Sequence, residues 1–300
     1  MRSAADPGKH CRTQTDRPRD MENGLGRRAQ GWRYAAPAPV SPGDCHMNPV
    51  MRGITYAILG LILSTAAFGA DPFPARLTLD YSLSRNGHEI GVVTRTLERN
   101  TDGRYAHTLW MRATGLTALV YRTEWREHGV FVVKDGDVLP QRFTETRTGD
   151  KRAYEHGVTF DRTRMLLVFG QQQQKSLSPG VQDQGSLIYA LMLKPLTAPG
   201  ERMIAVTDGK DVDTYALVYR GRESVSTPLG VFETIVIRRI TPKQLEQETR
   251  CQREKLPDEA CRPDDLTFWL APARNHAPVK LERRRKDETT TMILREARGL

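Results

Sequence analysis

The chain has 300 residues, a formal net charge of +9 at pH 7 and 38% hydrophobic residues. This length suits one large β domain or two small ones, and it is sufficient for a buried core. The positive charge comes without aromatic interleaving or a binding motif, which excludes the usual classes of nucleic-acid-binding protein.

Residues 51–69 have the pattern of a secretory signal peptide. Met51-Arg52 precedes an apolar run from Ile54 to Phe68, and Ala67-Phe68-Gly69 supplies the small residues of a cleavage site. The run is 15 residues long, whereas a membrane-spanning helix needs about 20. We therefore predict a cleaved signal, a mature chain from Ala70, a periplasmic location and no permanent membrane anchor.

Residues 1–50 precede this signal and are rich in Arg, Pro, Gly and Ala. Two interpretations remain open: translation starts at Met47 or Met51, or the segment is a disordered extension. We favour the first, because export signals normally begin the chain.

Residues 70–300 are predicted to form a single β-rich domain. Arg76 to Leu83 alternates apolar and polar residues, and Asn86-Gly87 then gives the strongest short hairpin signal. Further strands are predicted at 88–99, 105–113, 120–127, 130–134, 141–148, 153–161, 165–170, 202–207, 212–220, 231–240, 267–270, 279–285 and 290–295.

Strands this regularly spaced favour an all-β fold with one helix. We expect an antiparallel curved sheet that closes into an open, lipocalin-like or lipoprotein-carrier-like barrel. The single helix is predicted over 183–194, with Asp183 as its N-cap, an apolar face built on Leu187 and Leu191, and Lys194-Pro195 as its end. Such a helix covers a barrel end or the concave face of a sheet.

Cys251 and Cys261 are the two cysteines of the predicted mature chain. They lie in the polar stretch 241–265, which contains three prolines and reads as a surface loop. An oxidising compartment favours a disulfide between them. A metal site is the alternative, but no His lies beside either cysteine to complete the ligands. We expect no metal and no cofactor.

The mature chain resembles the family of exported proteins known as domain of unknown function 3108. The matching pieces are 81–91, 139–143, 182–187, 227–234, and 268–270 followed by 278–281. The resemblance implies a β-rich periplasmic protein and brings no assigned reaction and no catalytic residues.

No catalytic signature occurs in the sequence, neither a nucleophile elbow nor a zinc, phosphate or dinucleotide motif. We therefore predict a non-enzymatic protein. Gln182, Asp183 and Ser186 are candidate ligand contacts, although a helix N-terminus that satisfies its own amides is the favoured explanation of these residues. Trp110 and Trp125, with Glu124, are candidates for a pocket lining, although aromatic residues on strands more often pack across strands.

The sequence thus favours a protein that binds a hydrophobic or lipid-like ligand, or another envelope component, in a barrel cavity for envelope maintenance. A structural or protein-interaction module of the envelope is the alternative, followed by a hydrolase with a dispersed site. The basic run from Arg283 to Lys286 either contacts lipid phosphates or anionic glycans, or is a solvated strand end.

Overall fold

The computed structural model describes residues 71–120, 122–149, 153–255 and 264–300. The leader 1–50, the predicted signal peptide 51–69 and Cys261 lie outside the described residues. Among the helices that are described, none is long and apolar enough to cross a membrane.

Fifteen strands form one continuous sheet in the described part of the chain. They are β1 Arg76–Arg85, β2 His88–Arg99, β3 Tyr105–Ala113, β4 Glu124–Lys134, β5 Asp137–Thr148, β6 Tyr154–Asp161, β7 Leu166–Phe169, β8 Gln174–Ser176, β9 Gln182–Asp183, β10 Glu201–Thr207, β11 Val212–Thr227, β12 Gly230–Ile240, β13 Asp265–Ala271, β14 Ala277–Arg285 and β15 Glu288–Arg298. The helices are α1 Thr117–Val120, α2 Ser186–Leu193 and α3 Pro242–Glu254, with short 3-10 turns at Gly170–Gln172 and Pro272–Arg274. The antiparallel β fold predicted from the sequence is confirmed, and β9 with β10 is the parallel exception.

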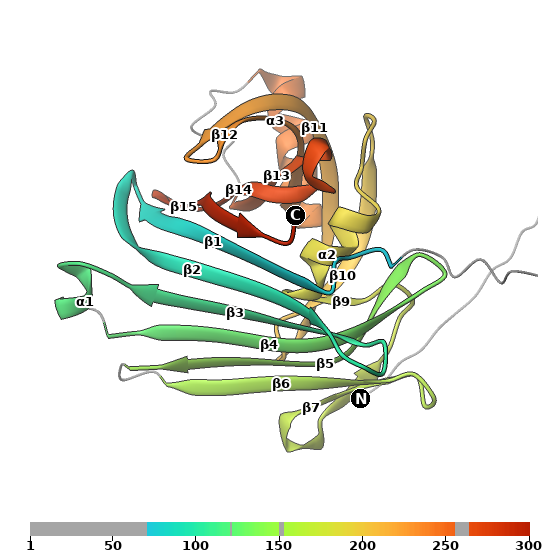
Figure 1. Ribbon diagram of the computed structural model, residues 1–300. Helices are drawn as coiled ribbons and strands as arrows, with labels where there is room; N and C mark the ends of the chain where they lie inside the picture. Colours follow the sequence, from blue (N-terminus) through green and yellow to red (C-terminus); the bar gives the residue numbers. More distant parts are fainter. Residues whose placement is uncertain (1–70, 121, 150–152, 256–263) are drawn as a thin grey trace, which may run out of the picture. The chain divides into compact units, whose positions relative to one another are not determined.

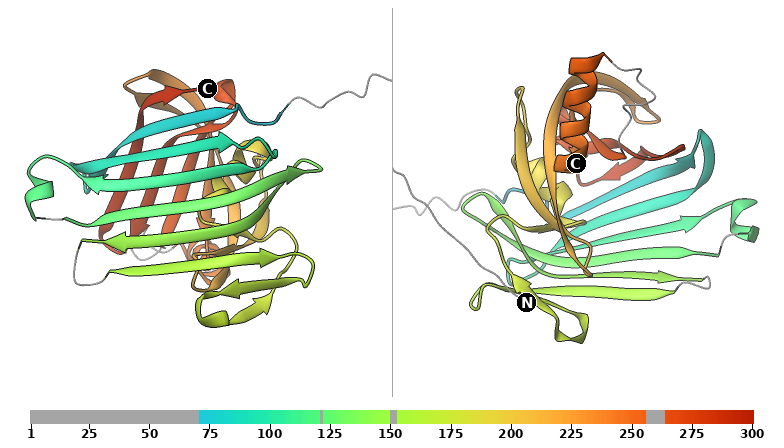
Figure 2. Two further views of the ribbon diagram at one scale, coloured as in Figure 1. Left: turned by 60° about the horizontal axis from the view of Figure 1, so that its bottom comes forward. Right: turned by 180° about the vertical axis from the view of Figure 1, so that it is seen from behind.

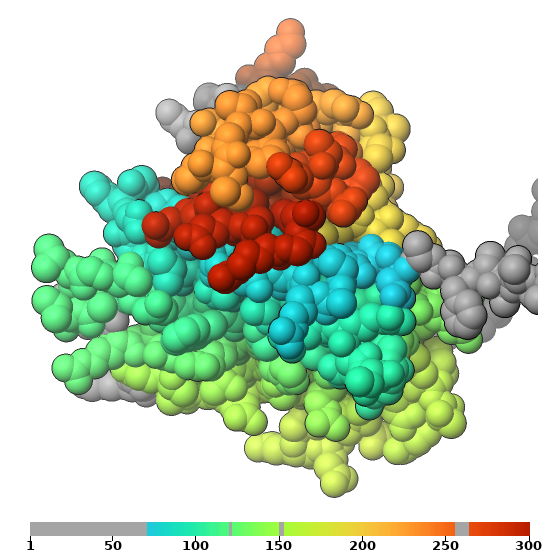
Figure 3. Space-filling view, viewed as in Figure 1, coloured from blue at the N-terminus to red at the C-terminus, as the bar shows by residue number. Residues whose placement is uncertain are grey.

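The first and last strands of the domain lie side by side in the middle of the sheet. The strand order runs β8 to β1, then β15 back to β9, and Figure 3 shows the C-terminal residues in red against β1 in blue. Tyr81 of β1 pairs with both Leu294 of β15 and Val93 of β2. The two halves of the sheet are therefore joined by contacts between the ends of the chain, which form slowly in folding because of their long sequence separation.

The sheet curves around α2 (Figures 1 and 2). We call the face that packs on α2 the inner face, β1 to β6 the first wall and β11 to β14 the second wall. α2 contacts β5, β9 and β14, and Leu187, Ile188, Tyr189 and Leu191 are buried. The helix is buried on several sides rather than along one apolar stripe, because both walls of one curved sheet enclose it.

Gly129 lies inside β4, whereas the sequence pattern suggested two separate strands on either side of it. β4 runs without interruption from Glu124 to Lys134. Gly129 pairs with His107 of β3, and a Cβ on Gly129 would lie 2.2 Å from Nε2 of His107. This glycine therefore makes room for a ring and does not mark a turn.

The stretch 241–265 is not the simple surface loop that its prolines and charges suggested, because it contains α3. Thr241 forms a capping box with Gln244, whose side chain accepts the Thr241 N–H at 2.8 Å. Pro242 stands in the first turn of the helix, where its missing N–H costs nothing.

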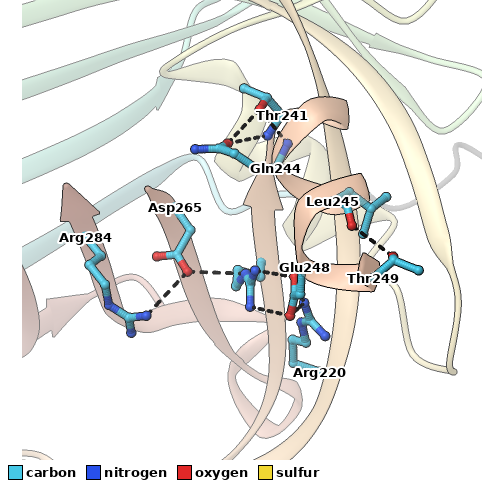
Figure 4. Close-up of polar contacts among 9 residues, drawn as sticks. Arg220, Thr241, Gln244, Leu245, Glu248, Thr249, Asp265 and Arg284 are labelled. Atoms are coloured by element: carbon cyan, nitrogen blue, oxygen red, sulfur yellow. Dashed lines mark hydrogen bonds and ion pairs between the residues drawn. The ribbon is translucent and has the colours of Figure 1, made fainter. Parts of the chain in front are cut away.

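Charged side chains attach α3 to the outer face of the second wall (Figure 4). Glu248 accepts hydrogen bonds from Arg220 at 2.6 Å and from Arg238 at 2.5 Å, and Arg238 also pairs with Asp265 at 3.2 Å. Cys251 is buried on this helix. Its pairing with Cys261 stays a prediction.

Candidate functional site

Three charged side chains lie on the inner face of the first wall, in one row across neighbouring strands. The register places Arg95 of β2 beside Leu109 of β3, Leu109 beside Glu127 of β4, and Glu127 beside Glu145 of β5. Arg95, Glu127 and Glu145 are 6%, 7% and 4% exposed. Charged residues are almost never buried this far unless they are paired or serve a function. We call this row the buried charge row.

The two carboxyl groups of the buried charge row are cross-strand neighbours that share a desolvated environment. The pKa of Glu145 is raised to about 7, chiefly by burial and also by the neighbouring Glu127, while the hydroxyl of Tyr154, which donates to Glu145 Oε1 at 2.8 Å, opposes the rise. Burial also raises the pKa of Glu127, and Arg95 and His107 oppose that effect. Each carboxyl therefore favours its protonated form more than an exposed one does.

The second wall presents guanidinium groups to the same interior. Burial lowers the pKa of Arg239 on β12, and its guanidinium lies 4.4 Å from the ring centre of Tyr215. Arg283 on β14 acts electrostatically on both Arg239 and Glu145. The partly buried Arg239 and the exposed Arg283 of the second wall thus lie within electrostatic range of the carboxyl groups of the first wall.

His107 lies next to the buried charge row and is enclosed by two glycines. Its side chain is fully buried, with Nε2 3.5 Å from Asp183 Oδ1. A Cβ on Gly129 would lie 2.2 Å from Nε2, and a Cβ on Gly185 would lie 2.1 Å from Cε1. The imidazole therefore fills a slot that exists because neither neighbour has a side chain.

Gln182, Asp183 and Ser186 come together at the start of α2. Gln182 donates to the carbonyl of Val138 at 2.9 Å, which ties β9 to β5. Asp183 accepts the Ser186 N–H at 2.7 Å, and Ser186 Oγ accepts the Asp183 N–H at 3.0 Å. The helix begins at Ser186 with Gly185 in the N-cap position, so the observed cap lies two residues after Asp183, the residue predicted for it. The Asp183 carboxylate still accepts a hydrogen bond from the first N–H of the helix.

Replacing Asp183 by alanine is expected to destabilise the fold by about 2 kcal/mol, because the buried Ser186 amide loses its hydrogen-bond acceptor. Asp183→Asn keeps an acceptor at the same place and is expected to cost less. Urea unfolding of both variants measures the difference. Unchanged stability with altered ligand retention would instead indicate that Asp183 contacts a ligand.

Trp110 and Trp125 lie on opposite faces of the sheet, so they do not line one pocket together. Trp125 of β4 pairs with Met111 on the inner face, and its ring packs edge-on against Tyr154 at 6.5 Å. Trp110 of β3 is on the outer face, where its indole N–H donates to Glu124 at 3.2 Å. The alternation of side chains along a strand produces this separation.

Several buried polar atoms on the inner face have no hydrogen-bond partner among the described residues. They include Glu127 Oε2, Glu145 Oε2, Asp183 Oδ2 and both ring nitrogens of His107. Unsatisfied buried polar groups are rare in proteins and usually mark water, an ion or a function. No group of three His, Cys, Asp or Glu side chains suited to a metal ion occurs in the described ranges. The arrangement suits hydrogen bonding to a polar group better than metal binding.

Arg95, His107, Glu127 and Glu145 were not identified from the sequence. The sequence did contain a signal of this site. Glu127 is one of the alternate residues that share one face of their strand, together with Trp125, Gly129 and Phe131. Arg95 similarly stands in frame between Val93 and Leu97, both of which are buried. Charged residues in the inward frame of a strand are the pattern that marks this site.

The chain belongs to the family described as protein of unknown function (DUF3108), whose model matches residues 80–295. The family predicted from the sequence is therefore confirmed. None of the curated proteins compared with the chain matches it significantly.

The solved structures that this chain resembles match it at low identity and with TM-scores below 0.5. A beta-barrel-like protein of domain of unknown function DUF1849 from Brucella abortus is 12% identical, with 75% of this chain and 98% of that chain covered and a TM-score of 0.49. A protein from Parabacteroides distasonis, proposed to be a lipoprotein, is 12% identical, with 76% and 98% covered and a TM-score of 0.31. A proposed outer membrane lipoprotein-sorting protein domain from Vibrio parahaemolyticus is 10% identical, with 76% and 86% covered and a TM-score of 0.23. Likeness at this level transfers no activity to this chain.

Proposed function

We propose that this chain is an exported, non-enzymatic protein of the cell envelope that binds a lipid-like ligand on the inner face of its sheet. The observation that carries the proposal is the buried charge row, with unpartnered Glu127 and Glu145 oxygens, next to incompletely buried apolar side chains. A polar group could meet the carboxyl oxygens while an apolar chain packs beside them.

The apolar side chains of the inner face differ in burial from one end of the strands to the other. Towards α2 it is filled by Phe73, Tyr105, Phe131 and Tyr189, whose rings pack with centroids 5.3 to 6.1 Å apart. On the other side of the buried charge row, Met111, Trp125, Leu266 and Met292 are only partly buried. This second set supports contact with an acyl chain, because these side chains pack against the core with only part of their apolar surface and leave the rest exposed.

Native mass spectrometry of protein purified from the periplasm without detergent tests the proposal. We expect extra mass that is lost on denaturation. Trp125→Ala is expected to reduce this retained mass, because Trp125 lies on the inner face. Trp110→Ala is the matched control, since it removes the same side chain from the outer face.

A clean mass for the protein alone, or equal retention in the two tryptophan variants, would contradict ligand binding at this site. The first result would favour the structural or protein-interaction module as the function. Recovery of the chain solely from the cytoplasm would contradict the envelope location.

A hydrolase with a dispersed site is the second candidate, favoured by one specific observation. Glu127 and Glu145 face each other across β4 and β5, and a carboxyl pair with raised pKa values supplies the proton donor that general acid catalysis needs. Chemical change of the retained ligand by wild type, but not by Glu145→Gln, would support this candidate over simple binding.

A further inference from the structure

The connection between β3 and β4 carries two strongly exposed leucines. Leu116 is 83% exposed and Leu119 is 76% exposed, more than any other large hydrophobic residue that the structure describes. Both lie in or beside α1, which projects from the sheet at the left in Figure 1. Neither contributes to the core, so stability of the fold does not explain them.

The strand register places α1 at one end of the first wall together with two tight turns. Gly91 pairs with Ala113, which brings the β1–β2 turn to the end of β3. Arg85 pairs with Thr290, which brings the β14–β15 turn to the same end. The leucines therefore share this end with the basic run from Arg283 to Lys286, which ends β14 and enters its turn.

The exposed charge of this end is predominantly positive. The exposed basic residues in and beside its turns are Arg85, Arg112, Arg122, Arg283, Arg285 and Lys286. The exposed acidic residues there are Glu89, Asp264, Asp287 and Glu288; Glu288 pairs with Arg85 at 3.3 Å, Glu89 pairs with Arg295 at 3.9 Å, and Asp264 accepts the Lys286 N–H at 2.8 Å. The excess of arginine and lysine complements an anionic partner.

We infer that this end of the sheet docks on the surface of an anionic lipid bilayer. Leu116 and Leu119 would enter the boundary between headgroups and acyl chains, while the surrounding arginines contact lipid phosphates. Two leucines on a short projection are too small a patch for the core of a stable protein interface, which needs roughly 800 Å² on each partner. Such a projection, ringed by basic residues, fits a peripheral membrane contact.

This contact differs from the predicted signal peptide and does not depend on a ligand bound inside the sheet. It is reversible, because two leucines bury far less apolar surface than a spanning helix. It also gives the basic run from Arg283 to Lys286 a role beyond that of a solvated strand end. The partner is the bilayer surface itself.

Vesicle flotation with the soluble protein, purified after expression of the full chain, tests the inference. The probes are vesicles of phosphatidylcholine with phosphatidylglycerol and vesicles of phosphatidylcholine alone. We expect wild type to float with the anionic vesicles and the double variant Leu116→Asp/Leu119→Asp to float about tenfold less. Circular dichroism of the double variant should match wild type, because both positions are exposed.

Met165→Asp is the matched control. Met165 is 50% exposed with φ 54°, a backbone conformation that Asp tolerates, and it follows β6 at the opposite end of the first wall. This variant should float like wild type. Absence of wild-type flotation, equal flotation with both kinds of vesicle, or equal loss in Met165→Asp would each overturn the inference.

Discussion

Replacing Gly185 or Gly129 by alanine is expected to destabilise the protein by about 3 kcal/mol in each case, measured by urea unfolding. The added methyl group would lie 2.1 Å from Cε1 or 2.2 Å from Nε2 of His107. The imidazole is fully buried and packs against Phe131, Phe143 and Tyr189. Because the ring has no free space to move into, either substitution must displace β4 from β3 or α2 from the first wall.

The backbone conformation of Gly185 separates this effect from a change in chain flexibility. Gly185 has φ −76° and ψ −45°, which alanine adopts readily, so the loss must come from the ring contact. Gly170→Ala is the control, since an added Cβ there meets no atom within 4 Å. We expect its effect to stay within about 0.5 kcal/mol.

A double-mutant cycle with His107→Ala makes the test specific. His107→Ala alone should cost about 2–4 kcal/mol through the cavity that it leaves. Adding Gly129→Ala should then cost much less than it does in wild type, because the methyl group enters the space of the missing ring. Additive losses would show that the glycines are required for another reason.

Local features of this fold could be predicted from the sequence because their causes are local. The alternation in Arg76 to Leu83 corresponds to β1, and Asn86-Gly87 adopts φ 48° and 82°, the positive values that its hairpin turn requires. The pairing of β1 with β15 could not be predicted, since alternation says nothing about which distant strand lies alongside. The helix α3 was missed because its capping box starts a helix of low apolar content.

The proximity of Glu127 to Glu145 depends on a single irregularity in the β4–β5 hairpin. Phe131 pairs with Pro140, but Val130 pairs with Arg142, so the register shifts by one residue at this point. Without that bulge, Glu127 would face Thr144 and Glu145 would point to the outer face. The buried residues of β5 are accordingly the even-numbered Val138 and Pro140 before the bulge, and the odd-numbered Phe143 and Glu145 after it. Only the structure reveals that this change of frame completes the buried charge row.

Stability is expected to fall as pH rises from about 4.5 to about 7, by about 1–3 kcal/mol from Glu145 alone, since solvent screening reduces the full effect of the shift. The folded protein holds the Glu145 proton up to a pKa of about 7, whereas the unfolded chain releases it near 4.5. In that interval the folded state binds more protons than the unfolded state, so each increase in pH favours unfolding. Burial of Glu127 acts in the same direction. Urea unfolding across this range measures the slope.

Glu145→Gln isolates this contribution, because the amide keeps the shape of the side chain and does not titrate. Its stability should be close to that of wild type at about pH 4.5 and higher by up to about 3 kcal/mol at about pH 8. Glu155→Gln on β6 is the surface control, since Glu155 is exposed. A difference between wild type and Glu145→Gln that does not change with pH would contradict the proton held in the buried charge row. If the pH-dependent difference in stability between wild type and Glu145→Gln disappears when ligand is retained, the polar group of that ligand contacts the Glu145 carboxyl.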